Sequence, residues 1–285
     1  MSDPGAVAAE RGHIDLHAHT TASDGTATPA QFVAAAVAAK LSAVAVTDHD
    51  TVASVEEVTR LAAAEGIRVV AGVELSVHDD LDREVHLLGL HIENLALMEQ
   101  TLIGLRDARR IRAVGIVEKL NTLGVPLPFD DVLAQSDGAA IGRPHVARAL
   151  MQAGHVSSLQ EAFDRWLGGG KPAYVEKQRL RFADGIALVH RTGGIAVYAH
   201  PGAEATRERI EPLVAIGLDG VEVRHPSHGS EAIKRIKGLV AHFGLVPSGG
   251  SDWHGAAGGS RVLGCMQVNP EWLDLQLARV AAQAA

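Results

Sequence analysis

The sequence is poor in cysteine, in aromatic residues and in clustered positive charge, and each shortage argues against a class of protein. Its 285 residues include a single cysteine, Cys265, which excludes an internal disulfide and a cysteine-based zinc site. Aromatic residues make up 4%, which argues against a surface that stacks nucleobases. The formal net charge is −8 without a long run of Lys or Arg, which argues against tight binding to duplex nucleic acid.

Long apolar runs are also missing. No stretch of about 18 uncharged apolar residues occurs, so we expect no membrane-spanning helix and no membrane partner. Residues 1–12 lack the basic and apolar regions of a signal peptide, and together with the single cysteine they favour a cytoplasmic protein. Hydrophobic residues nevertheless make up 47%, a globular composition at a length that is normal for an α/β barrel. Histidine, by contrast, is abundant, with fifteen residues.

Short apolar runs alternate with helical patterns at both ends of the chain. Residues 42–46 form a continuous apolar run, as expected for a buried parallel strand. Thr28 and Ser54 each begin a capping-box pattern, which predicts helices that end near residues 40 and 66. The predicted strands are residues 13–17, 42–46, 67–77, 84–90, 194–198, 220–224 and 245–248. This alternation of strand and helix predicts an α/β fold built on a parallel sheet or barrel.

Between these two regions, residues 95–191 lack strand signals and predict a helical insertion. Helices are expected there at residues 95–123, 128–135, 145–153 and 159–167. After the insertion, helices are expected at residues 205–216, 230–243 and from about residue 270. The predicted domains are therefore a tail at residues 1–12, a discontinuous barrel domain at residues 13–94 and 192–285, and an insertion domain at residues 95–191.

Histidines and carboxylates gather where the predicted strands end. His17 and His19 close the first strand, and residues two apart in a strand share a face, so both imidazoles can chelate one metal ion. The alternative is that this pair merely faces solvent. Gly249 and Gly250 precede another such group and would let the backbone approach a crowded centre closely. The further residues of this kind are Asp48, His49, Glu74, His86, His200, Asp252 and His254.

Several of these residues have a simpler explanation when they are considered one at a time. His86 alone would be a hydrogen-bonded core histidine, and Asp24 alone would belong to a turn. A carboxylate at Glu74, late in an apolar strand, is costly to bury unless it is paired or binds a metal. Five strands with such groups near one rim favour a metal centre. Imidazole and carboxylate without thiolate suit zinc, manganese or iron, and the ligands are numerous enough for two or three ions.

Together these residues resemble the motifs of the polymerase-and-histidinol-phosphatase (PHP) family. The matching motifs are His17-Ala18-His19-Thr20, Ser23-Asp24-Gly25, Thr47-Asp48-His49, Glu74, His86, Ala199-His200-Pro201 and Ser251-Asp252-Trp253-His254. The resemblance covers about residues 14–91 and 194–254. It implies a distorted (β/α)7 TIM-like barrel with a trinuclear centre of divalent ions, with Mn²⁺ favoured and Zn²⁺ or Fe²⁺ as alternatives.

The resemblance also implies which residues bind each ion. The first ion would be bound by His17, His19, Glu74 and Asp252. The second would be bound by the bridging Glu74 with His86 and His200. The third would be bound by Asp24, His49 and His254. Asp48 would orient a ligand without binding an ion itself.

The insertion is most similar to that of stand-alone family members that act on 3′,5′-nucleoside bisphosphates or nucleoside 5′-monophosphates, and to relatives that trim RNA 5′ ends. This likeness implies that a metal-activated hydroxide hydrolyses the phosphate monoester of a small nucleotide. In the Gly-Arg-Pro-His segment, Arg143 would clamp a phosphate with His145 beside it, and Lys171 would contact the substrate. Alternatively, Arg143 holds the insertion together, His145 packs or orients Arg143, and Lys171 is a solvated loop residue.

Residues 220–228 resemble the family more loosely, because Arg224-His225 departs from the expected aromatic or small residues. His225 or His228 could protonate the leaving group, and His228 could also contact the substrate.

Four other functions remain open. They are a histidinol phosphate phosphatase, an exonuclease for the 5′ end of a short oligonucleotide, an amidohydrolase-type barrel that cleaves C–N bonds, and a metal-binding domain without activity. The Ser-Asp-Gly and Thr-Asp-His motifs favour a phosphoesterase over an amidohydrolase, and the insertion favours nucleotides over histidinol phosphate. The complete set of ligand motifs argues against an inactive domain.

Overall fold

The computed structural model describes residues 12–135, 141–176, 180–256, 258 and 261–283, and the chain divides into two compact units. The barrel unit comprises Met1–Glu99 and Leu180–Ala285, and the insertion unit comprises Gln100–Arg179. Residues 1–11 of the predicted tail lie outside the described residues. The insertion unit is shorter than the predicted segment 95–191, because α7 (Phe182–Arg191) packs on strands of the barrel.

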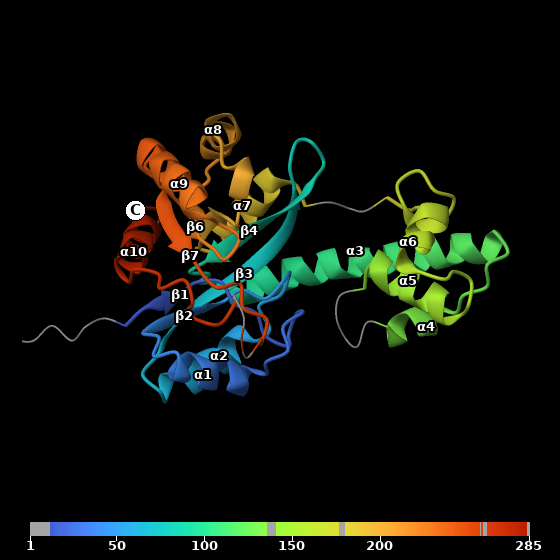
Figure 1. Cartoon of the computed structure of the whole chain (residues 1–285), viewed down its shortest axis with the longest axis horizontal. Helices are drawn as coiled ribbons and strands as arrows, with labels where there is room; N and C mark the ends of the chain where they lie inside the picture. The colour runs from blue at the N-terminus through green and yellow to red at the C-terminus, as the bar shows by residue number, and fades with distance from the viewer. Residues whose placement is uncertain (1–11, 136–140, 177–179, 257, 259–260, 284–285) are drawn as a thin grey trace, which may run out of the picture. The chain divides into compact units, whose positions relative to one another are not determined.

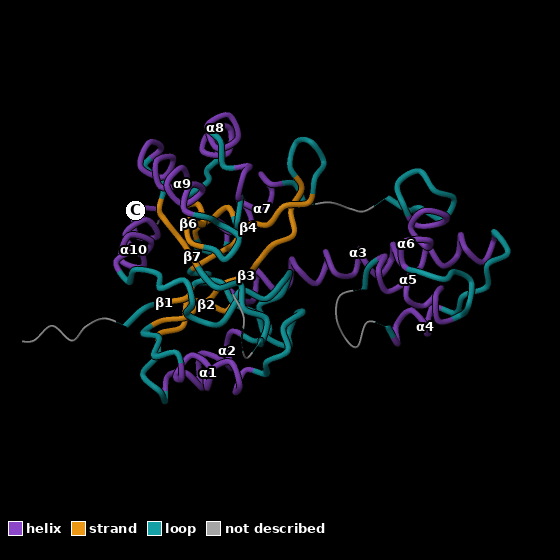
Figure 2. The backbone as a smooth tube through the Cα atoms, in the orientation of Figure 1, coloured by secondary structure: helices purple, strands orange, loops and turns teal. Residues whose placement is uncertain are grey.

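Seven strands form one sheet in the order of the chain (Figures 1 and 2). They are β1 (Ile14–Asp15), β2 (Ala43–Val46), β3 (Arg68–His78), β4 (Glu84–Leu90), β5 (Ile195–Tyr198), β6 (Gly220–Arg224) and β7 (Val246–Gly249). The Leu16 N–H donates to the Gly249 carbonyl at 3.0 Å, so the segments after β1 and at the end of β7 meet and nearly close the ring. The predicted α/β barrel of seven strands is therefore confirmed.

One strand of the barrel runs against the others. β4 is antiparallel to both β3 and β5, whereas the remaining neighbours are parallel. The alternation of strands and helices did not predict this reversal, which follows because the loop between β3 and β4 is too short for a parallel crossover. In the hairpin, His86 near the start of β4 lies opposite Ser76, two residues beyond Glu74. The reversal therefore brings the start of β4 to the rim where the parallel strands end.

Helices cover the outside of the barrel (Figure 1). They are α1 (Pro29–Ala38), α2 (Val55–Ala63), α7, α8 (Arg207–Ala215), α9 (Ser230–Phe243) and α10 (Glu271–Gln283), with a short 3-10 helix, η2, at Gly202–Glu204. The predicted capping box at Thr28 is confirmed, because its hydroxyl accepts from the Gln31 N–H and the Gln31 side chain accepts from the Thr28 N–H. Strand residues such as Leu88 and Val197 form an apolar cluster with Leu273 of α10, which leaves polar groups to the rim.

The insertion unit has an apolar core of its own, which includes Leu120, Val146 and Leu167. Its elements are most of α3 (Leu95–Thr122), α4 (Phe129–Ala134), α5 (Arg143–Gln152), α6 (Leu159–Ala162) and the π-helix η1 (Phe163–Leu167). Figure 2 shows helices and loops in this part of the chain, as the lack of strand signals predicted. Within the described part of the chain, every helix is too short or too polar to cross a bilayer.

Candidate metal centre

Nine side chains predicted as metal ligands converge at one end of the barrel. They are His17, His19, Asp24, His49, Glu74, His86, His200, Asp252 and His254. Candidate ligand atoms lie within 4.8 Å of one another in three groups, which are His17, His19, Glu74 and Asp252; His19, Asp24, His49 and His254; and His49, Glu74 and His86. The convergence at one rim is as predicted. The division of the ligands among ions remains a prediction.

Glu74 on β3 lies at the centre of this cluster. The distances from its Oε2 are 3.1 Å to His17 Nε2, 3.2 Å to His19 Nε2 and 3.3 Å to His49 Nε2. The distances from its Oε1 are 2.9 Å to His86 Nδ1 and 3.0 Å to His200 Nε2. One carboxylate therefore faces five imidazoles, and its two oxygens face different sets of rings, as a bridging ligand requires.

The polar atoms of the cluster fit a metal centre. His17 Nε2, both ring nitrogens of His19 and Glu74 Oε2 are buried without a hydrogen-bond partner among the described residues. A buried polar atom left unsatisfied costs about 1–3 kcal/mol. Several such atoms that face one another are explained if they coordinate cations, and imidazole with carboxylate suits divalent transition metals.

The charges in the cluster also fit a metal centre. Burial lowers the pKa of His17, but Glu74 and Glu222 raise that pKa to well above the ordinary histidine value. For His19, the effect of burial is outweighed by Asp252 and Glu74, which raise the pKa to about 9. Burial raises the pKa of Glu74, yet His17 and its neighbours hold that pKa well below the usual value. The ionised carboxylates therefore stabilise the protonated form of the neighbouring imidazoles. Cations that bind to these imidazoles must displace their protons.

Two of these residues adopt a backbone conformation that is rare outside glycine. The φ angle is 29° at His200 and 51° at Asp252. Such a conformation costs on the order of 1–3 kcal/mol and persists only where the surroundings enforce it. Here the Asp252 N–H donates to the His17 carbonyl at 2.8 Å, and the His200 N–H donates to Glu222 Oε2 at 2.7 Å. The fold therefore holds strained backbone at the positions of two predicted ligands.

Gly250 allows the chain to pass close to His17. A Cβ atom at position 250 would lie 2.4 Å from both the backbone nitrogen and the Cβ of His17, which excludes any side chain. This contact confirms the prediction that glycine permits a close approach here.

Asp48 organises the loop that carries Asp24. Its Oδ1 accepts from the Thr20 N–H and from the Ser23 hydroxyl, both at 2.7 Å, and its Oδ2 accepts from the Thr20 hydroxyl at 2.7 Å. The Ser54 hydroxyl also donates to Oδ2. The predicted capping box at Ser54 is therefore wrong: this hydroxyl binds Asp48, and the described Ser54 side chain makes no cap bond to α2.

Glu222 on β6 is a residue that the sequence argument missed. It is fully buried, lies 3.0 Å from His17 Nδ1 through Oε1 and accepts from the His200 N–H through Oε2. The signal was available, because a carboxylate flanked by Val221 and Val223 in a buried strand requires a partner.

The two predicted acid residues differ in their surroundings. His228 Nδ1 donates to the Val223 carbonyl at 3.1 Å and its Nε2 accepts from the Gly202 N–H at 3.1 Å, so the backbone occupies both nitrogens. His225 Nδ1 accepts from the Ser227 N–H, which leaves the proton on Nε2, and this nitrogen lies 3.3 Å from Asp252 Oδ2. His225 therefore contacts a predicted ligand residue, whereas His228 fixes the segment after β5.

Arg261 is a second residue that was not predicted. Its guanidinium contacts Asp252 Oδ2, and its side chain is 46% exposed. It follows Gly258 in a segment that lacks strand or helix periodicity, so nothing in the sequence singled it out.

Arg143, His145 and Lys171 all lie in the insertion unit. The Arg143 guanidinium lies 5.6 Å from the Phe163 ring centre and 5.9 Å from that of Tyr174, and it donates to the Leu167 carbonyl at 3.3 Å. That hydrogen bond agrees with the alternative in which Arg143 holds the insertion together.

The neighbouring His145 is fixed by the start of its own helix. Its Nδ1 accepts from the Gly142 N–H at 2.9 Å, and burial together with Arg148 lowers its pKa. The Gly142 N–H contact places the proton of the neutral His145 ring on Nε2. Lys171 is exposed in the loop after η1.

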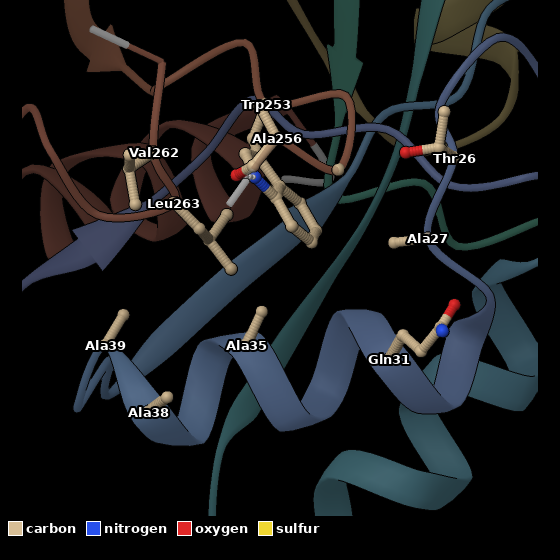
Figure 3. A pocket seen from close by; sticks show the side chains of 11 residues that line it. Thr26, Ala27, Gln31, Ala35, Ala38, Ala39, Trp253, Ala256, Val262 and Leu263 are labelled. Carbon is tan, nitrogen blue, oxygen red and sulfur yellow. Dashed lines mark hydrogen bonds between the residues drawn. The ribbon is translucent and has the colours of Figure 1, made fainter. Parts of the chain in front are cut away.

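A separate cavity lies between α1 and the segment after β7 (Figure 3). Its volume is about 660 Å³, and its walls include Ala35, Ala38, Trp253 and Leu263. None of the nine predicted ligands is among its described lining residues, and the lining offers no charged side chain. Its described lining therefore offers no charged side chain to a phosphate.

Comparison with known proteins agrees with this geometry. A family model described as PHP domain matches residues 15–179. A 5′-3′ exoribonuclease from Haemophilus influenzae is 35% identical over 246 residues, which cover 84% of this chain and 89% of that protein. A 3′,5′-nucleoside bisphosphate phosphatase from Chromobacterium violaceum is 33% identical over 284 residues, which cover 95% of this chain and 99% of that protein. A crystal structure described as a metal-dependent phosphoesterase from Bifidobacterium adolescentis has a TM-score of 0.72 at 33% identity, and the match covers 93% of this chain and 96% of that one.

Proposed function

This chain belongs to the PHP family and is a hydrolase of phosphoric ester bonds, and we propose that its substrate is the phosphate monoester of a small nucleotide. The observation that carries the proposal is the convergence of five imidazoles on the Glu74 carboxylate at one rim of the barrel. A nucleotide is supported by the bisphosphate phosphatase, because it matches this chain almost from end to end. A 3′,5′-nucleoside bisphosphate and a nucleoside 5′-monophosphate are the proposed substrates.

The nine clustered residues would hold three divalent ions, of which Mn²⁺ is the first choice and Zn²⁺ or Fe²⁺ are alternatives. Glu74 would bridge the first and second ions, and the remaining ligands would be divided as their motifs imply. Such ions supply hydroxide at neutral pH and neutralise the oxygens of a phosphate ester. Asp48 would keep the Asp24 loop in place, and His225 would hold the second oxygen of Asp252.

Substrate recognition would depend on Arg143. The Phe163 and Tyr174 rings flank its guanidinium, which would bind two phosphate oxygens at once. His145 would donate its Nε2 proton to the substrate, and Lys171 would add a second positive charge. His225 is a better candidate than His228 for the general acid, because both nitrogens of His228 are used by the backbone.

A second candidate is removal of nucleotides from the 5′ end of a short RNA. Gln100–Arg179 holds 11 of the 26 Lys and Arg residues but only 8 of the 34 Asp and Glu residues. Its net charge is therefore +3, whereas the rest of the chain carries −11. Positive charge in the insertion unit favours a substrate with several phosphates. We propose the cytoplasm as its compartment, where such substrates occur and a single cysteine stays reduced.

A phosphate-release screen with Mn²⁺ tests the substrate. We expect kcat/KM to be highest for a 3′,5′-nucleoside bisphosphate or a 5′-monophosphate, lower for histidinol phosphate, and ammonia release from amides to be absent. Short 5′-phosphorylated RNAs in the same screen test the second candidate. Fastest turnover of histidinol phosphate would overturn the proposed substrate.

Elemental analysis of the purified protein tests the metal centre. We expect close to three transition-metal ions per chain, and loss of both metal and turnover in His17→Ala. A wild-type protein that holds no transition metal and is not activated by Mn²⁺ would overturn the proposed mechanism.

A further inference from the structure

Glu222 uses both of its carboxylate oxygens on residues of the predicted metal centre. Its exposed fraction is 0%, so each oxygen needs a donor from the protein. Oε1 lies 3.0 Å from His17 Nδ1, and Oε2 accepts from the His200 backbone N–H at 2.7 Å. One side chain therefore touches residues that are assigned to two different ions.

The contact with His17 determines which nitrogen of that ring can bind a cation. Both oxygens of Glu222 face donors, since Oε2 accepts from the His200 N–H while Oε1 faces His17 Nδ1. A carboxylate that accepts at both oxygens leaves the proton of this contact on His17 Nδ1. Nε2, which lies 3.1 Å from Glu74 Oε2 and 3.5 Å from Asp252 Oδ1, is therefore the nitrogen that would give up its proton to bind a cation. Glu222 thus directs His17 toward the first ion site.

The contact with His200 acts through the backbone. His200 has a φ angle of 29° and precedes Pro201, where steric contact with the proline ring restricts the backbone further. The hydrogen bond from its N–H to Glu222 holds this strained conformation. In this conformation, His200 Nε2 lies 3.0 Å from Glu74 Oε1 and 3.3 Å from His86 Nδ1. These three side chains are the ones assigned to the second ion.

We propose that Glu222 is a positioning residue that couples the first and second ion sites, through the His17 ring and the His200 backbone respectively. The proposal rests on the proposed function for its division of ligands among ions. Among the contacts described, none joins Glu222 to Asp24, His49 or His254. Loss of its charge should therefore weaken two ion sites together and spare the third.

Asp219, the residue directly before β6, provides a matched control. It is 3% exposed, and its Oδ2 lies 2.7 Å from His190 Nε2 and accepts from the Ala196 N–H at 2.9 Å. Asp219 and Glu222 therefore make the same kinds of contact to a histidine and to the backbone around β5, but only Glu222 contacts predicted ligands. Asp219→Asn reports the general cost of neutralising a buried carboxylate between these strands.

The decisive variant is Glu222→Gln. Glutamine keeps the size and one acceptor, but its amide group presents N–H to either His17 or His200, both of which already donate. Titration of metal-free protein with Mn²⁺ should show two sites weakened by about 10- to 100-fold and one site unchanged. Asp219→Asn should bind all ions with wild-type affinity, even if its melting temperature falls as far as that of Glu222→Gln.

A second readout does not depend on metal. In ¹⁵N-histidine-labelled, metal-free protein at a pH high enough for a neutral His17 ring, the proton should lie on Nδ1 in the wild type and in Asp219→Asn, and this preference should be lost in Glu222→Gln. Unchanged affinity at every site with an unchanged His17 tautomer would overturn the proposal. Equal weakening of all three sites would do the same. If the wild type binds no metal, the proposed function fails, and the tautomer alone decides whether Glu222 positions His17.

Discussion

At the scale of single residues, Arg143 illustrates how a planar cation can be held ready for a phosphate. Two aromatic rings flank its guanidinium, and one hydrogen bond to the Leu167 carbonyl uses part of its donor capacity. Guanidinium has five N–H donors in a rigid plane, so most of them stay available to a phosphate. The contacts of Arg143 within the insertion unit are therefore compatible with its proposed role in binding a phosphate.

Replacing Arg143 by alanine should reduce kcat/KM for a nucleotide substrate by roughly 10- to 100-fold, mainly through KM, because charged hydrogen bonds to phosphate are lost. Metal content should stay at the wild-type value. Steady-state kinetics and elemental analysis measure the two effects. Arg165→Ala is the control, since Arg165 lies in the same unit and pairs with Glu161 on the surface. Wild-type kinetics in Arg143→Ala would remove Arg143 from the substrate site.

At the scale of elements, the carboxylate of Asp79 anchors the β3–β4 hairpin. Asp79 Oδ1 accepts from the backbone N–H groups of Leu81 and Arg83, and Oδ2 accepts from the side chains of Arg83 and Arg209. Burial raises the pKa of Asp79, but its hydrogen bonds with the two arginines bring that pKa below the ordinary value. Because Arg209 belongs to α8, the hairpin that carries Glu74 and His86 is anchored to a distant helix.

We expect Asp79→Asn to lower the free energy of unfolding by about 1.5–3 kcal/mol at pH 7. A carboxyl whose pKa is lowered in the folded state stabilises the fold above its unfolded pKa of about 3.9, and this contribution is lost as the pH falls through the folded value. The difference from wild type should therefore shrink below about pH 4. Urea denaturation at pH 7 and pH 3.5 measures it, with the exposed Glu57→Gln as the control. A difference that is independent of pH would contradict the argument.

Elements also mark the limit of what the sequence predicts. The convergence of the predicted ligands at one rim was predictable because the motif residues follow apolar strands, and such strands are recognised by composition alone. The direction of β4 was not, because apolar periodicity is the same in parallel and antiparallel strands, and only the short loop after His78 decides between them. Glu222 was missed for a related reason. A carboxylate in a buried strand indicates that it has a partner, but the sequence does not show which one, because His17 is 205 residues away.

At the scale of the whole molecule, the barrel closes where the predicted ligands are densest. His17 and His19 follow β1, Asp252 and His254 follow β7, and the Asp252 N–H donates to the His17 carbonyl. Ions bound to these residues would join the two ends of the sheet. Since the unfolded chain has no such site, binding must stabilise the folded state.

Adding Mn²⁺ to metal-free protein should therefore raise the melting temperature, with a stabilisation of about 2.7 kcal/mol at a free concentration 100 times Kd. Differential scanning calorimetry across a Mn²⁺ series measures the shift. His17→Ala should show a much smaller increase, whereas Arg165→Ala should behave as the wild type. If Mn²⁺ did not change the melting temperature of the wild type, metal binding to the cluster would not stabilise the fold, contrary to this prediction.

The closure of the ring between β1 and β7 has a consequence inside a living cell. A barrel that is fastened by cations opens more often when those cations are scarce, and opened chains are substrates for proteases. The amount of this protein should then follow the supply of transition metal even when its synthesis is constant. Starvation for metal would remove the enzyme itself, and recovery would require new synthesis.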